Sequence, residues 1–186
     1  MVADAKWGPL APLAGVWEGD NGLDVSFVHR HGQVRETRFR ERAQFAAFGP
    51  VENGRQVLYG LDYRTAAWRE GEQDPFHTEV GYWLWDAADG QVMRCFVVPR
   101  GSMVLAGGTA AASDRAFTMD AEVGSETYGV LSNRYLSGAA RTVAYHLEVT
   151  VGDDWWSYEE TATLEHAEHS RELLGHSDRN RLERVE

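Results

Sequence analysis

Short segments with the composition of β-strands follow one another along this chain at nearly regular intervals. Turn-forming residues separate them, as in Glu52-Asn53-Gly54, Asp74-Pro75 and Asp89-Gly90. Seven tryptophans, seven tyrosines and seven phenylalanines supply side chains that favour strands. No segment longer than a turn or two repeats apolar residues at helical spacing. The pattern therefore restricts the chain to an all-β fold.

About ten strands are predicted, preceded by one short helical turn. The turn is expected at 9–14, and the first strand begins with Gly15-Val16-Trp17. The others are expected at 33–48, 56–68, 76–85, 91–98, 102–112, 116–123, 141–151, 155–165 and 176–185. Hairpin turns without βαβ alternation indicate an antiparallel meander, which spacing alone allows to be a sandwich or a barrel.

The last strand favours the barrel. His176, Asp178, Asn180 and Leu182 share one face, and the opposite face reads as solvent-exposed. A dry sandwich core would not tolerate this mixture of polar and apolar side chains, but a partly wet cavity would. We therefore predict a single antiparallel meander β-barrel over residues 1–186, with its core at about 13–185 and a cavity inside.

Charge argues against nucleic acid as a partner. The chain has 29 acidic and 18 basic residues, a formal net charge of −11, which repels phosphate backbones. The most basic segment, Arg35–Arg42, also contains acids and reads as one solvated strand face. No nucleic-acid partner is expected.

Nothing in the sequence indicates a membrane partner either. The chain lacks an apolar run of about 18–20 residues, and its first six residues lack the apolar core of a secretion signal. The single cysteine, Cys95, excludes an intramolecular disulfide and suits a reducing compartment. A cytoplasmic location is expected.

Two segments resemble a known family. Leu13–Gly19 carries the Gly-x-Trp motif that opens calycin-type barrels, and Phe76–Trp83 is similar to the His-x-Glu-x-Gly-Tyr stretch of nitrobindins. Nitrobindins are haem-binding barrels related to fatty-acid-binding proteins. The resemblance extends over roughly Leu13 to Val185, with Phe96–Leu105 in the position of the family's next hairpin.

The resemblance implies a ferric haem b in the barrel mouth, with nitric oxide and peroxynitrite chemistry at its iron. In the family, a histidine near the last strand holds the iron in a Pro-His-Leu context. The nearest equivalent here is His176, in Gly175-His176-Ser177, and it is the one candidate metal ligand. His77 matches a family histidine that faces the cavity. No residue is assigned a catalytic role.

The remaining pocket residues follow from the same comparison. Trp17, Trp83 and Phe96 are expected to form the apolar part of the pocket. Arg100 and Asn180, together with His77, are expected to meet a polar head group.

Two alternatives stay open, and two histidine clusters receive a structural interpretation. The barrel could hold a fatty acid or another small apolar ligand without haem or catalysis, or its own tryptophans could fill it. A homodimer is also left open. His29 and His31 share a strand face and could bind a metal, but they are interpreted as surface loop. Glu165–His169 is interpreted as a solvated turn, because it lacks the His-Glu-x-x-His order of a metal motif.

Overall fold

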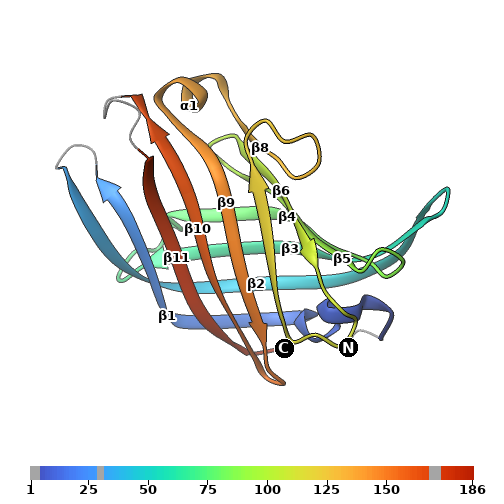
Figure 1. The fold of residues 1–186 in the computed structure, drawn as a ribbon. Helices are drawn as coiled ribbons and strands as arrows, with labels where there is room; N and C mark the ends of the chain where they lie inside the picture. The colour runs from blue at the N-terminus through green and yellow to red at the C-terminus, as the bar shows by residue number, and fades with distance from the viewer. Residues whose placement is uncertain (1–4, 29–31, 168–172) are drawn as a thin grey trace.

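The computed structural model describes residues 5–28, 32–167 and 173–186, and strands make up most of it (Figure 1). In chain order the elements are the 3-10 helix η1 (Ala5–Leu13), β1 (Gly15–Val28), β2 (Gln33–Asn53), β3 (Gln56–Arg69), β4 (His77–Asp86), β5 (Gln91–Val98), β6 (Ser102–Thr109), β7 (Ala116–Glu122), β8 (Val130–Ser132), the helix α1 (Arg134–Ala139), β9 (Ala140–Val151), β10 (Trp155–His166) and β11 (Leu173–Arg184).

Ten of these strands close into a barrel. Each of β1 to β5 pairs antiparallel with the strand that follows it in the chain. The ring then continues from β6 through β7, β9, β10 and β11 back to β1. The short β8 lies outside the ring and pairs with β6. The predicted antiparallel meander barrel is therefore confirmed.

Several element boundaries differ from the predictions; among them, β6 ends at Thr109, three residues before the predicted end, and η1 begins at Ala5 rather than at residue 9. Gly49-Pro50 does not end β2, because the strand continues past it to Asn53 after a shift of register between Phe48 and Val51. β11 begins at Leu173, three residues before the predicted start. β8 and α1 were not predicted, because their segment shows neither clear alternation nor helical spacing.

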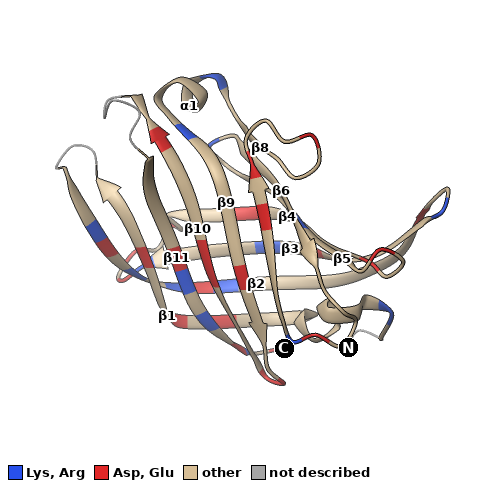
Figure 2. Cartoon of the chain, in the orientation of Figure 1, with Lys and Arg blue, Asp and Glu red and all other residues tan. Residues whose placement is uncertain are grey.

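Side chains alternate between the interior and solvent along each strand. On β2, Arg38 and Arg40 are exposed, whereas Phe39 and Glu41, which alternate with them, are buried. Arg38, Arg40 and Arg42 thus share the outer face that was predicted, but Arg35 falls on the face of Phe39 and Glu41 and is exposed near the start of the strand. Figure 2 shows acidic and basic residues interspersed along the strands.

One end of the barrel is filled by apolar side chains. The helix η1 covers this end, with Leu10 and Leu13 fully buried. The Trp7 indole Nε1 donates hydrogen bonds to Phe48 O and Gly60 O, both at 3.0 Å, which fastens η1 to β2 and β3. We call this the closed end.

The other end is partly accessible to solvent, and we call it the open end. Because consecutive strands of a meander run in opposite directions, the start of β4 and the start of β11 lie together at this end. Interior side chains here are only partly buried, including His77, His176 and Asp178. The sequence therefore folds into a barrel that is closely packed at one end and partly exposed to solvent at the other.

Among the described residues, no helix is long and apolar enough to span a membrane.

Candidate functional site

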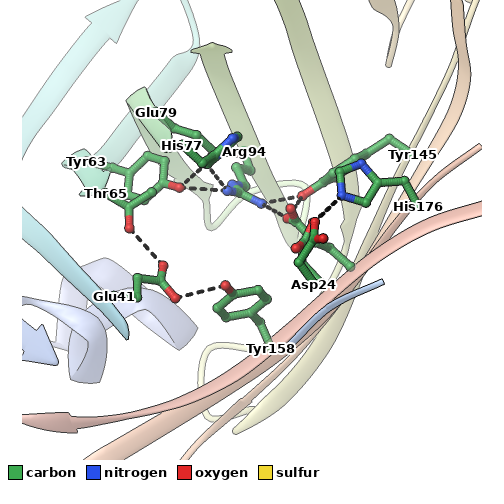
Figure 3. Close-up of polar contacts among 12 residues, drawn as sticks. Asp24, Glu41, Tyr63, Thr65, His77, Glu79, Arg94, Tyr145, Tyr158 and His176 are labelled. Atoms are coloured by element: carbon green, nitrogen blue, oxygen red, sulfur yellow. Dashed lines mark hydrogen bonds and ion pairs between the residues drawn. The ribbon is translucent and has the colours of Figure 1, made fainter. Parts of the chain in front are cut away.

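A buried arginine binds polar groups from four other strands across the barrel interior. Arg94 Nη1 donates to Glu160 Oε2 on β10 at 2.8 Å, and Arg94 Nη2 donates to the Tyr63 hydroxyl on β3 at 2.7 Å. Arg94 also donates to Glu79 on β4 and to the Tyr145 hydroxyl on β9 (Figure 3). Because β5 and β10 are not neighbours in the ring, these contacts cross the interior. We call the five residues the Arg94 cluster.

A second buried cluster lies beside it, around Glu41 on β2. Its carboxylate accepts hydrogen bonds from Thr65 Oγ1 at 2.8 Å, the Tyr158 hydroxyl at 2.8 Å and Asn180 Nδ2 at 3.0 Å. Burial raises the pKa of Glu41 above its ordinary value, although these three donors oppose the shift. We call the two clusters together the polar belt.

The charges within the Arg94 cluster compensate one another. The Arg94 side chain is 6% exposed and that of Glu79 is 4% exposed. Burial opposes ionisation of Glu79, but the Arg94 charge and the His77 contact overcome it and lower its pKa to about 2. Buried charges of this kind persist only when they are paired and hydrogen-bonded.

His77 stands at the open-end side of this cluster. Its Nε2 lies 3.1 Å from Glu79 Oε1. Burial would lower the pKa of His77, yet the hydrogen bond and negative charge of Glu79 raise it from 6.5 to about 9. The imidazole is therefore protonated at neutral pH, and its charge is already paired.

His176 forms a separate carboxylate cluster. Its Nε2 lies 2.6 Å from Asp24 Oδ2 on β1 and 3.4 Å from Asp178 Oδ2 on β11. Asp24 and Asp178 are directly opposite in the β1–β11 pairing, and the ligand atoms of all three side chains lie within 4.8 Å of one another. We call these three residues the His176 cluster.

The His176 cluster places two carboxyl groups against one imidazole. Burial opposes protonation of His176, but the hydrogen bond to Asp24 and the nearby carboxylates raise its pKa. Burial and the negative charge of Glu160 raise the pKa of Asp178 to about 8. His77 and His176 both feel the charge of Glu160, and Figure 3 shows them on either side of Arg94.

The predicted aromatic pocket residues lie in the packed part of the interior. Trp17 is fully buried at the closed end, where its Nε1 donates to Leu13 O at 2.7 Å. Trp83 is 1% exposed. Phe96 lies against the Arg94 guanidinium, 4.3 Å from Arg94 Cζ to the ring centre. The alternative in which the chain's own tryptophans fill the barrel thus applies to its closed end.

The polar pocket residues divide between the interior and the rim. Asn180 is buried in the polar belt, bonded to Glu41. The interior position considered for Arg100 is wrong, because this residue is exposed in the turn between β5 and β6. A turn side chain at the rim can extend into water, and the interior arginine is instead Arg94.

The two histidine clusters of the sequence are only partly described. His29 and His31 lie outside the described residues, as do Glu168 and His169. His166 is described and is buried, 7% exposed, at the end of β10. It therefore does not lie in a fully solvated turn.

Sequence reasoning missed the charged residues that organise the interior. Arg94 lies between the buried Val92 and Phe96 on β5, so strand alternation alone places it inside. The same alternation places Glu160 on the inner face of β10. Asp24 reaches the interior only because an irregularity between Gly19 and Gly22 shifts the alternation that starts at Trp17. Strand alternation was thus a signal that could have found Arg94 and Glu160. A charged side chain on a predicted inner face, however, is normally taken as a sign that the two faces of the strand have been assigned the wrong way round.

A shallow recess lies at the rim of the open end. It has a volume of about 680 Å³ and is lined by Arg134, Tyr135, Gly138, Ala139 and Ala167. None of these belongs to the polar belt or to the His176 cluster. The recess therefore lies on the rim, and the histidines line a different part of the opening.

Comparison with known proteins agrees with this architecture. The sequence profile of the THAP4-like, heme-binding beta-barrel domain matches residues 6–184. The chain belongs to this family. A structure described as Rv2717c from M. tuberculosis matches with a TM-score of 0.67 at 18% sequence identity, over 100% of both chains. No curated protein sequence matches the chain. The resemblance to haem-binding barrels of the nitrobindin type is confirmed.

The family implies haem, so the arrangement of the histidines can be compared with what haem requires. An iron bound to His176 would need the Nε2 lone pair, but this atom faces Asp24 and Asp178. For that nitrogen to bind iron, both carboxylates would have to move away from it. His77 Nε2 faces Glu79 in the same way. As arranged here, neither histidine fits an iron–imidazole bond.

Proposed function

We propose that this chain is a small-molecule-binding barrel, whose ligand lies in the open end and is held by polar contacts rather than by an iron–histidine bond. One observation carries the proposal. The interior side chains of His77, His176 and Asp178 are 42%, 34% and 22% exposed, whereas Arg94 beneath them is 6% exposed. Solvent therefore reaches a set of polar interior groups that rests on the buried Arg94 cluster, in which Arg94 is paired with Glu79 and Glu160.

The charges at the open end favour a ligand with a positive charge or several hydrogen-bond donors. Arg94 is neutralised by Glu79 and Glu160, and His77 and His176 are paired with carboxylates. A fatty-acid carboxylate entering this part of the barrel would meet Asp178 without an unpaired cation to receive it. An amine would instead find acceptor oxygens. This geometry favours an amine over the small apolar ligand expected from the sequence.

Native mass spectrometry and thermal shift test this function. The protein, held in a chelator to exclude metal ions, is screened against a panel of small amines and a panel of fatty acids. We expect an amine to form a one-to-one adduct and to raise Tm, and Asp178→Asn to weaken the effect. The matched control is Asp120→Asn, on the outer surface. Stabilisation by fatty acids alone would overturn the proposal.

Haem b is a second candidate, favoured by the family match over residues 6–184. On this alternative the iron would supply the nitric oxide and peroxynitrite chemistry that the nitrobindin resemblance implies. His176 would have to leave Asp24 before it could bind. The alternative therefore predicts that Asp24→Asn, which weakens the Asp24 contact, strengthens binding of ferric haem.

A haem titration separates the two candidates. The Soret band is followed in the unmodified chain and in the His176→Ala, His77→Ala and Asp24→Asn variants. We expect no change in the Soret band that depends on either histidine. A shift that disappears in His176→Ala and grows in Asp24→Asn would establish haem as the ligand and overturn the polar-ligand proposal.

A further inference from the structure

We propose that Asp24, His176 and Asp178 form a binding site for a divalent transition-metal ion, which does not require haem and which shares Asp178 with the small-molecule site proposed above. The site brings together one residue from β1 and two from β11, which lie on the same interior face of adjacent strands. It offers one imidazole nitrogen and two carboxylate oxygens, a donor set typical of Zn²⁺ and related ions.

The three ligand atoms converge on one point. Both carboxylates approach the same nitrogen of His176, at 2.6 Å for Asp24 and 3.4 Å for Asp178. Ligands that lie about 2.0–2.2 Å from a common ion are separated from each other by roughly 3–3.5 Å. Small rotations of these side chains would therefore place an ion between them.

A similar trio on the outer surface shows what distinguishes this arrangement. His146 also has two carboxylate neighbours, but Asp120 lies 2.6 Å from its Nδ1 and Glu148 lies 3.3 Å from its Nε2. The two carboxylates are on opposite edges of the ring, so they cannot share an ion with one imidazole nitrogen. Both trios contain a histidine and two carboxylates, so these residue types alone do not make a metal site. The inner trio differs because both of its carboxylates approach the same nitrogen of His176.

Asp24 is also held in the orientation that a ligand needs. Ser26 Oγ donates a hydrogen bond to Asp24 Oδ1 at 3.0 Å, which leaves Oδ2 directed at His176. A hydrogen bond to the non-ligating oxygen is the usual way in which a protein orients a metal-binding carboxylate. Ser26 is therefore a positioning residue for the site.

The charge of the site suits a divalent ion better than haem iron. A divalent ion bound by all three side chains would neutralise both carboxylates. An iron held by His176 alone would leave Asp24 and Asp178 beneath a porphyrin without a cationic partner, an arrangement that buried carboxylates do not tolerate. The arrangement that opposes an iron–histidine bond is thus the one that favours a bare metal ion.

Isothermal titration calorimetry with Zn²⁺ tests the site. The full chain is first treated with a chelator, dialysed into a non-chelating buffer and titrated. We expect one Zn²⁺ per chain, with affinity weakened by about tenfold or more in Asp24→Asn and in Asp178→Asn and lost in His176→Ala. Ser26→Ala should weaken binding by about tenfold, because it frees the Asp24 carboxylate to rotate.

Asp120→Asn, in the outer trio, is the matched control and should leave the titration unchanged. Circular dichroism of each variant shows whether it folds. If His176→Ala does not fold, the visible absorption of bound Co²⁺, compared between the unmodified chain and Asp178→Asn, reports the ligand set instead. Absence of stoichiometric Zn²⁺ binding, or binding that persists unchanged in both aspartate variants, would overturn the proposal.

Discussion

The two ends of the barrel interior are stabilised by different means. At the closed end, Leu10, Leu13 and Trp17 fill the space with apolar side chains that are fully buried. In the polar belt, the same inner faces of the strands carry Arg94 and several buried acids. The closed end depends on volume and close packing, whereas the belt depends on every charge having its partner.

The difference between the two ends indicates where a binding site can form without destabilising the fold. A packed end tolerates little change, because each removed methylene leaves a cavity. A belt of paired charges is rigid only while its pairs are complete, and at its upper edge His77 and His176 are open to solvent. The closed end therefore supports the barrel, and the open end has the groups that can exchange a partner for a ligand.

The largest effect is expected at Arg94. Arg94→Ala leaves Glu79 and Glu160 without their cation, and breaking a buried pair in this way costs about 3–5 kcal/mol. Urea unfolding followed by tryptophan fluorescence measures the loss. The triple variant Arg94→Met, Glu79→Gln, Glu160→Gln removes the charges together and should recover most of it. A single variant as stable as the unmodified chain would show that the belt is not held by this arginine.

The closed end gives the next largest effect. Leu13 is fully buried beneath η1, so Leu13→Ala leaves a cavity that costs about 2–5 kcal/mol. Ligand or Zn²⁺ affinity measured on the folded variant should not change, because Leu13 does not touch the open end. Loss of stability together with loss of affinity would mean that the two ends are coupled.

The sequence predicted the architecture better than the site. Alternation along β9, β10 and β11 and the turn residues between strands were sufficient for a ten-stranded meander, because they are local properties. Trp17 was correctly placed inside. Its position at the closed end, away from the mouth, depends on η1 folding back across the barrel, and no local pattern encodes that.

The candidate site depends on contacts between distant strands, which explains why it was only partly predicted. His77 and His176 were recognised from the resemblance. Their partners were not, because Glu79 and Asp24 acquire their roles only when the barrel closes. Arg100 was considered because it stands in a conspicuous Pro-Arg-Gly turn, and Arg94, although it lies between Val92 and Phe96 on β5, was not considered.

A smaller effect is expected from the ionisation of His77, whose pKa is raised from 6.5 to about 9. A group that binds its proton more tightly when folded stabilises the fold fully below pH 6.5, and this contribution is lost as the pH rises through 9. The negative groups that face His77 are Glu79, Glu160 and Asp178. Because the imidazole is half-exposed, solvent reduces the contribution to about 0.5–1 kcal/mol.

Urea unfolding of the unmodified chain and of His77→Gln at pH 6 and pH 10 isolates this contribution. The unmodified chain should be the more stable at pH 6, and the difference between the two should shrink at pH 10. A difference that stays constant across this range would mean that His77 contributes by packing rather than by charge.

The smallest effect is expected at Arg100, and it tests the boundary between the rim and the interior. Its side chain is exposed, so Arg100→Ala should change the free energy of unfolding by less than about 0.5 kcal/mol. The effect of Arg100→Ala on ligand affinity is the more informative measurement. If the ligand is held by the open-end carboxylates, the affinity stays the same, because Arg100 is outside that set. If the affinity for an anionic ligand such as haem falls, Arg100 supplies a positive charge for that ligand, which Arg94 cannot do because it is already paired. The binding site would then include the rim of the barrel.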